Sequence, residues 1–160
     1  MRRWLLLTTA LFAVFASCAA ETEEFVDRAT LLKEPAVQVR FPWAVELAHV
    51  GAERVTTFEG PQSAFDGYIL GTDAEAEVVH SFYARELGRL GWIPESTTRR
   101  STAELAAWWW CKSGITYRLA IKDQKSAFQP EFYRGQTFRT VFDASLVSRG
   151  RSVPCTNDPR

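Results

Sequence analysis

Apolar residues recur at helical spacing over residues 73–90, and this segment is the clearest predicted element of the chain. Thr72 and Glu75 match a capping box at its start, in which each side chain accepts a backbone N–H. Gly91 stands where a left-handed C-terminal cap is needed, and Trp92 can fold back on the last turn. Gly88 is costly inside a helix, so we expect a close packing partner there. The apolar stripe consists of Val79, Phe82, Tyr83, Leu87 and Leu90.

Shorter alternating segments predict strands before and after this helix. We expect residues 54–58 to pair with residues 65–71 across the turn signal at 59–61, and residues 108–111 to form a hairpin with 115–121. Pro42 argues against a central strand around it. A short helical turn fits residues 101–104, and a long polar loop fits 123–135. The expected strands are residues 54–58, 65–71, 108–111, 115–121 and 137–147, and residues 92–93 begin a strand or an extended segment.

These elements predict an α+β fold, with one main helix packed on an antiparallel sheet of about four or five strands. The chain shows no internal repeat and no low-complexity segment. Its hydrophobic content of 46% is typical of a folded protein.

The first residues follow the layout of a secretory signal. Arg2 and Arg3 are followed by an apolar run from Trp4 to Ala16, and Glu21 stands soon after it. Because a membrane-spanning helix needs about 20 apolar residues, this run is too short to be one. We therefore expect export from the cytoplasm.

Residues 15–18 resemble the lipobox that the lipoprotein signal peptidase recognises. Ala16, Ser17 and Cys18 fit the pattern, whereas Phe15 stands where an aliphatic residue is usual. The resemblance implies cleavage before Cys18, a diacylglycerol thioether on its sulphur, and a further chain, such as palmitate, on the freed amine. The alternative is an ordinary signal peptide cut near Ala20.

The lipobox divides the chain into three parts. Residues 1–17 are the expected lipoprotein signal peptide, residues 18–36 the lipid-anchored N-terminus and tether, and residues 37–160 a single α+β domain. The chain has 19 basic and 19 acidic residues. Removing Arg2 and Arg3 leaves a slight excess of acids, which gives no attraction to nucleic acid.

Two cysteines remain once Cys18 is assigned to lipid. In an oxidising compartment, Cys111 and Cys155 favour a disulfide that pins the C-terminal tail. The alternatives are half of a metal site or two free thiols. With only His49 and His80 in the chain, a zinc site is poorly supplied, and we expect no metal and no cofactor.

Three consecutive tryptophans form the most distinctive cluster. In a strand, Trp108 and Trp110 point to one side and Trp109 to the other, so at least one ring can lie at a surface. The functional interpretation is an aromatic platform for a glycan, lipid or protein. The structural interpretation is that both sides are covered. Lys112, Arg118 and Arg139 are candidates for a polar rim.

The segment from Phe82 to Trp92 (FYARELGRLGW) resembles the helix of small exported bacterial proteins, many of them lipoproteins, that carry FY-x3-L-x3-GW after a strand and before a hairpin. The similarity extends over roughly residues 45–147. It implies a fold and an exported location, but no activity.

Catalytic signatures do not stand out in the sequence. His80 and Ser81 are helix neighbours that point about 100° apart. The acids at 66, 73, 75 and 77 lack the spacing of a calcium loop. We therefore expect a non-enzymatic domain on the extracytoplasmic face of a membrane, which binds a protein or envelope component and no nucleic acid. The alternatives are a carrier or sensor of an apolar ligand and an envelope hydrolase.

Overall fold

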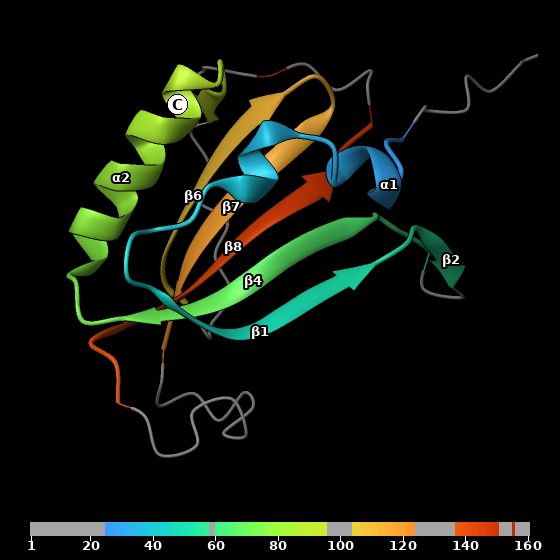
Figure 1. The fold of residues 1–160 in the computed structure, drawn as a ribbon. Helices are drawn as coiled ribbons and strands as arrows, with labels where there is room; N and C mark the ends of the chain where they lie inside the picture. The colour runs from blue at the N-terminus through green and yellow to red at the C-terminus, as the bar shows by residue number, and fades with distance from the viewer. Residues whose placement is uncertain (1–24, 58–59, 96–103, 124–136, 151–154, 156–160) are drawn as a thin grey trace, which may run out of the picture.

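The computed structural model describes residues 25–57, 60–95, 104–123, 137–150 and 155. They form one six-stranded antiparallel sheet in the order β1-β4-β8-β7-β6-β5, one main helix α2, and a separate hairpin β2–β3 (Figure 1). The elements are α1 (Arg28–Leu31), a 3-10 helix η1 (Pro35–Gln38), β1 (Val45–Ala52), β2 (Val55–Thr57), β3 (Gly60–Gln62), β4 (Phe65–Thr72), α2 (Ala76–Arg89), β5 (Ile93–Glu95), β6 (Glu104–Lys112), β7 (Ile115–Lys122) and β8 (Thr140–Ser148).

The α+β fold is confirmed, but the sheet has six strands rather than four or five. The missing strand is β1, whose side chains are mostly exposed or half-buried and therefore give no clear alternation. The predicted pairing of residues 54–58 with 65–71 is wrong. β2 pairs with β3, whereas β4 pairs with β1 and β8.

Helix α2 starts later than predicted, because Thr72 still belongs to β4. The capping box does not form: Glu75 is the N-cap without a side-chain cap, and the Thr72 hydroxyl accepts the Ala74 N–H at 3.3 Å. The C-terminal cap is confirmed. Gly91 has φ 80°, and the Trp92 N–H donates to the Leu87 carbonyl at 3.0 Å.

Two further expectations concern glycines and turns. Gly88 has open space around its missing Cβ, so the expected packing partner is absent. The hairpin of β6 and β7 is confirmed, and Ser113 and Gly114 both have positive φ, as a two-residue hairpin turn requires. Glu104 begins β6 rather than ending a helical turn. Residues 101–103 and 124–136 lie outside the described residues.

The sheet has two faces that differ in character. The helix face lies against α2 and carries Leu70, Tyr117 and Phe142, which are fully buried. Neighbouring strand residues alternate, so Trp109, Arg118 and Asp143 lie on the reverse face. Figure 1 shows α2, α1 and η1 on the same side of the sheet.

The N-terminal segment from residue 25 is part of the domain. Val26, Leu31, Ala36 and Val37 are buried in the core, and the Phe41 ring meets the Phe82 ring edge-on at 5.3 Å. Within the predicted tether, Val26, Leu31 and Ala36 are thus core side chains, whereas Leu32 is exposed. Residues 1–24, with the predicted signal peptide and Cys18, lie outside the described residues.

Candidate functional site

The three tryptophans of β6 do not form one exposed platform. Trp110 is only 3% exposed and packs against Tyr117 on the helix face. Trp108 is half-buried on the same face, and Trp109 is half-buried on the reverse face. The sequence predicted the split between faces correctly, but burial differs from one ring to the next.

His80 of α2 covers the Trp108 ring. The imidazole stacks on it with ring centres 4.3 Å apart and planes 14° from parallel. Its Nδ1 lies 3.4 Å from a Glu77 carboxylate oxygen, whereas Ser81 next to it is exposed. His80 therefore makes a packing contact with the cluster.

The candidate rim residues do not converge on the tryptophans. Lys112 donates to the Leu90 carbonyl at 3.1 Å. Arg139 pairs with Glu75 at the start of α2, and Arg118 lies on the reverse face. Each cation thus serves a separate local contact.

Sequence reasoning missed a buried ion cluster around Asp66. Its carboxylate is fully buried and accepts two bonds from the Arg28 guanidinium, at 2.6 and 3.0 Å. His49 Nε2 lies 3.0 Å from both carboxylate oxygens. A Cβ on Gly51 would come within 2.8 Å of both Arg28 and Asp66, so only glycine leaves room for this ion pair. The cluster fastens α1 to β1 and β4.

An aromatic stack extends this cluster. The His49 ring lies parallel to the Tyr68 ring at 4.2 Å, and the Arg40 guanidinium lies 3.6 Å from the Tyr68 ring centre. Arg40, Asp66 and Tyr117 also line a cavity of about 10 Å³, which is room for one water molecule. Asp66 lies buried near Gly51, whereas the other acids considered as calcium ligands, at 73, 75 and 77, adjoin the start of α2. Nothing in the sequence links Arg28 with Asp66, because 38 residues separate them.

A second ion network lies on the reverse face. Arg118 pairs with Asp143 at 3.2 Å and with Glu104. Lys122 lies 3.4 Å from Asp143 and 3.7 Å from Glu104. The Glu104 side chain is only 4% exposed. Two cations thus balance two carboxylates over β6, β7 and β8.

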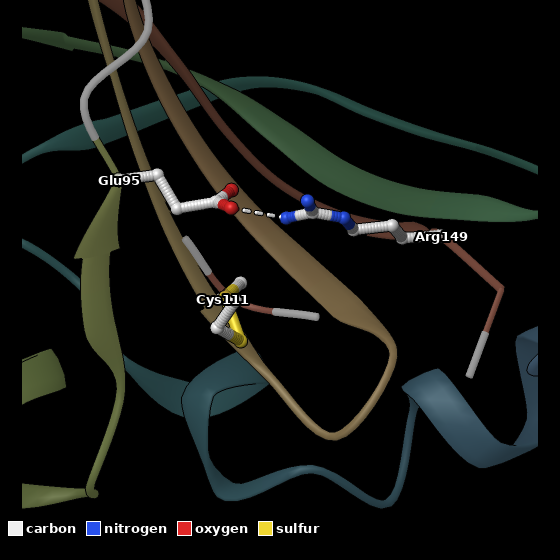
Figure 2. The surroundings of a disulfide bond; sticks show 4 residues. Glu95, Cys111 and Arg149 are labelled. Carbon is white, nitrogen blue, oxygen red and sulfur yellow. Dashed lines mark hydrogen bonds and ion pairs between the residues drawn. A yellow bond between two sulfur atoms is a disulfide. The ribbon is translucent and has the colours of Figure 1, made fainter. Parts of the chain in front are cut away.

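Cys111 and Cys155 are joined by a disulfide, with Cα atoms 5.7 Å apart and a sequence separation of 44. Beside it the Arg149 guanidinium donates to the Glu95 carboxylate (Figure 2). The covalent bond and the ion pair both tie the segment after β8 to the β5–β6 edge of the sheet.

Trp43 is the most exposed large apolar side chain among the described residues, with 93% of its surface free. It follows Pro42 and has φ 61°, which is uncommon for a bulky residue and costs roughly 1–3 kcal/mol. Val45 of β1 and Val78 of α2 are also exposed. Sequence reasoning missed this exposure, because hydrophobicity alone predicts burial for a tryptophan.

Chain position and sheet register place these residues at the same end of the domain. Val45 at the start of β1 pairs with Gly71 near the end of β4, the strand that leads into α2. Val78 lies one helical turn before Phe82, whose ring contacts Phe41. We call Trp43, Val45 and Val78 the Trp43 patch.

The core tyrosines are the groups with the largest changes in acidity. Burial raises the pKa of Tyr83 to about 12, and burial also raises the pKa of Tyr117 well above its usual value. The Tyr83 hydroxyl lies near Tyr117 and the Phe41 backbone but makes no hydrogen bond of ordinary geometry. Both tyrosines pack in the core of the domain.

Open hollows of about 330 and 320 Å³ flank the domain. One is lined by Val26, Thr30, Glu34, Ser113 and Ile115, and the other by Leu105, Ile121, Lys122, Asp123, Arg139, Thr140 and Val141. Neither is lined by tryptophan or phenylalanine. In the described ranges, no three His, Cys, Asp or Glu side chains gather as metal ligands would. Nor is any helix there long and apolar enough to cross a membrane.

The chain matches no family model, no curated protein and no solved structure. The resemblance of the Phe82–Trp92 segment to exported lipoproteins therefore stays a prediction.

Proposed function

We propose that the chain is a non-enzymatic binding protein, exported and anchored by lipid on Cys18 to the extracytoplasmic face of a membrane. The signal-like N-terminus and the lipobox support the exported, lipid-anchored location. The Cys111–Cys155 disulfide supports an oxidising compartment.

The exposed Trp43 patch carries the binding part of the proposal. Tryptophan is a preferred anchor in protein interfaces, because one rigid side chain contributes a large apolar area. Here the Trp43 ring is exposed, whereas Trp110, Tyr117 and Phe142 of the helix face are buried. An apolar-ligand carrier is less well supported, because the hollows of a few hundred cubic ångströms lack aromatic linings.

The lipid-anchored location is tested with full-length protein in membranes of the producing cell. The unchanged chain should label with palmitate and enter the detergent phase on Triton X-114 partition, and Cys18→Ala should do neither. A Cys18→Ala variant that still enters the detergent phase would overturn lipidation at this residue.

The binding role is tested in the same membranes by native electrophoresis. The unchanged chain should migrate in a complex, and Trp43→Ala should release it. Leu32→Ala is the matched control, because Leu32 is an exposed apolar residue at the end of α1. Loss of the complex in both variants, or a chain that migrates alone, would contradict a binding role for the Trp43 patch.

A further inference from the structure

Strand β1 is an open edge of the sheet. In the described part of the chain it pairs only with β4, and Figure 1 shows it at the border of the sheet. The opposite edge, β5, has three residues and contains Pro94, which disfavours pairing with a further strand there. β1 has eight residues and neither lysine nor proline. Its outer N–H and C=O groups therefore offer a template for one more strand.

The side chains of β1 extend an apolar strip to this edge. On the reverse face the strand presents only apolar residues, and the neighbouring strand adds Phe65 and Ile69. None of these side chains is fully buried. The β1 members of the strip are Val45, Ala48, Val50 and Ala52.

The Trp43 patch is continuous with this strip, because Val45 belongs to both. A strand laid beside β1 would pass Val45 and reach the exposed Trp43 ring. A strand edge and an aromatic anchor are the two elements of strand-addition binding: backbone bonds supply affinity, and side-chain pockets supply selectivity.

The charged side chains near this edge indicate the kind of partner. Glu46 is exposed on β1, and Asp73, Glu75 and Glu77 are exposed near the start of α2. Arg139 near the start of α2 already pairs with Glu75, and the Arg40 guanidinium lies over the Tyr68 ring of β4. This end of the domain therefore attracts basic groups and repels an anionic membrane surface.

The position of the N-terminus also argues against a lipid partner. The Phe25 ring lies 3.8 Å from the Arg54 guanidinium, just past the end of β1 that is farthest from Trp43. With lipid on Cys18, seven residues of chain reach at most about 25 Å. The anchor would thus hold that end near the bilayer, and the Trp43 patch would point away from it.

We infer that the open edge of β1 binds an extended, basic and apolar segment of a partner protein, which adds to the sheet as a further strand and contacts Trp43. This inference rests on the proposed binding role and names its partner chemistry.

The experiment measures fluorescence anisotropy of a short fluorescein-labelled peptide that alternates valine with lysine and threonine, added to the full chain in detergent. A peptide with glutamate for lysine and one with a central proline are the comparison probes. The basic alternating peptide should bind about tenfold more tightly than either.

Edge variants separate strand addition from simple apolar contact. Ala48→Lys on β1 and Trp43→Ala should each weaken binding about tenfold, whereas Val55→Lys on β2 should change it less than about twofold. Circular dichroism and the thermal midpoint check that each variant folds. Unchanged binding in Ala48→Lys, or equal binding of the proline peptide, overturns strand addition.

Two other occupants of the edge would give distinct results. A concentration-dependent dimer that Ala48→Lys abolishes would assign the edge to a second copy of the chain. Trp43-dependent binding to phosphatidylglycerol vesicles would assign it to lipid, and either result overturns the inference. If the native complex is lost in Trp43→Ala but kept in Ala48→Lys, the binding role stands and strand addition fails.

Discussion

The two faces of the sheet bury their side chains in different ways. The helix face is filled by rings and aliphatic chains, including Tyr83, Tyr117 and Phe142, which α2 and the N-terminal segment cover. The reverse face instead carries an ion network around Arg118, a disulfide, and an apolar strip that remains half-exposed. Stability is therefore expected to reside mainly on the helix face, and interaction on the reverse face and its edge.

The strongest test replaces one phenylalanine on each face of the sheet by alanine. Phe142→Ala should lower the free energy of unfolding by about 4 kcal/mol, because it leaves a cavity in a fully buried core. Phe65→Ala on the half-exposed reverse face should cost about 1 kcal/mol. Urea unfolding of the oxidised protein measures both, and equal losses would remove the contrast between the faces.

The next effect concerns the covalent link on the reverse face. Replacing both Cys111 and Cys155 by alanine should cost about 3 kcal/mol, because the unfolded chain loses a long closed loop. A reductant should destabilise the natural chain by a similar amount and leave the double variant unchanged. A natural chain that is insensitive to the reductant would argue against the bond.

A smaller effect compares the two ion clusters. Asp66→Asn should cost about 2 kcal/mol, since it leaves the partly buried Arg28 without its charge partner. Asp143→Asn should cost at most about 1 kcal/mol, because Arg118 keeps Glu104. Thermal unfolding gives both values, and a double-mutant cycle of Asp66→Asn with Arg28→Ala should show strong coupling.

The smallest effect concerns Tyr83 inside the helix face. Tyr83→Phe should change stability by less than about 1 kcal/mol at neutral pH, because the hydroxyl makes no regular hydrogen bond. Its raised pKa means that an unfolded chain loses the proton near pH 10.0 while the folded chain keeps it to about 12, so stability falls as the pH rises through this interval. Tyr83→Phe should reduce that alkaline loss of stability.

Local patterns were enough to predict several elements. The spacing of Val79, Tyr83 and Leu87 identified α2, because a helix that buries one face repeats its apolar residues every turn. The alternation of residues 115–121 predicted the second strand of the β6–β7 hairpin, because a strand points successive side chains to opposite faces. The start of α2 was misplaced, because Thr72 pairs with Thr140 in the sheet and this long-range bond outweighs a local cap.

The candidate site was much less predictable. Trp108, Trp109 and Trp110 attracted attention as a run, yet the exposed ring is Trp43, because exposure depends on what packs above a residue. The Asp66 cluster joins α1, β1 and β4, and its members carry no shared sequence pattern.

For this chain, sequence alone determined the class of fold, the main helix, the central hairpin and the expectation of a lipid-bearing Cys18. Those follow from local periodicity, turn chemistry and short motifs, which act within a few residues. Tertiary structure decided that β1 forms one edge of the sheet, that Arg28 pairs with Asp66, and that Trp43 is exposed to solvent. These depend on strand register and on contacts between distant segments, because burial and charge pairing are properties of the assembled sheet.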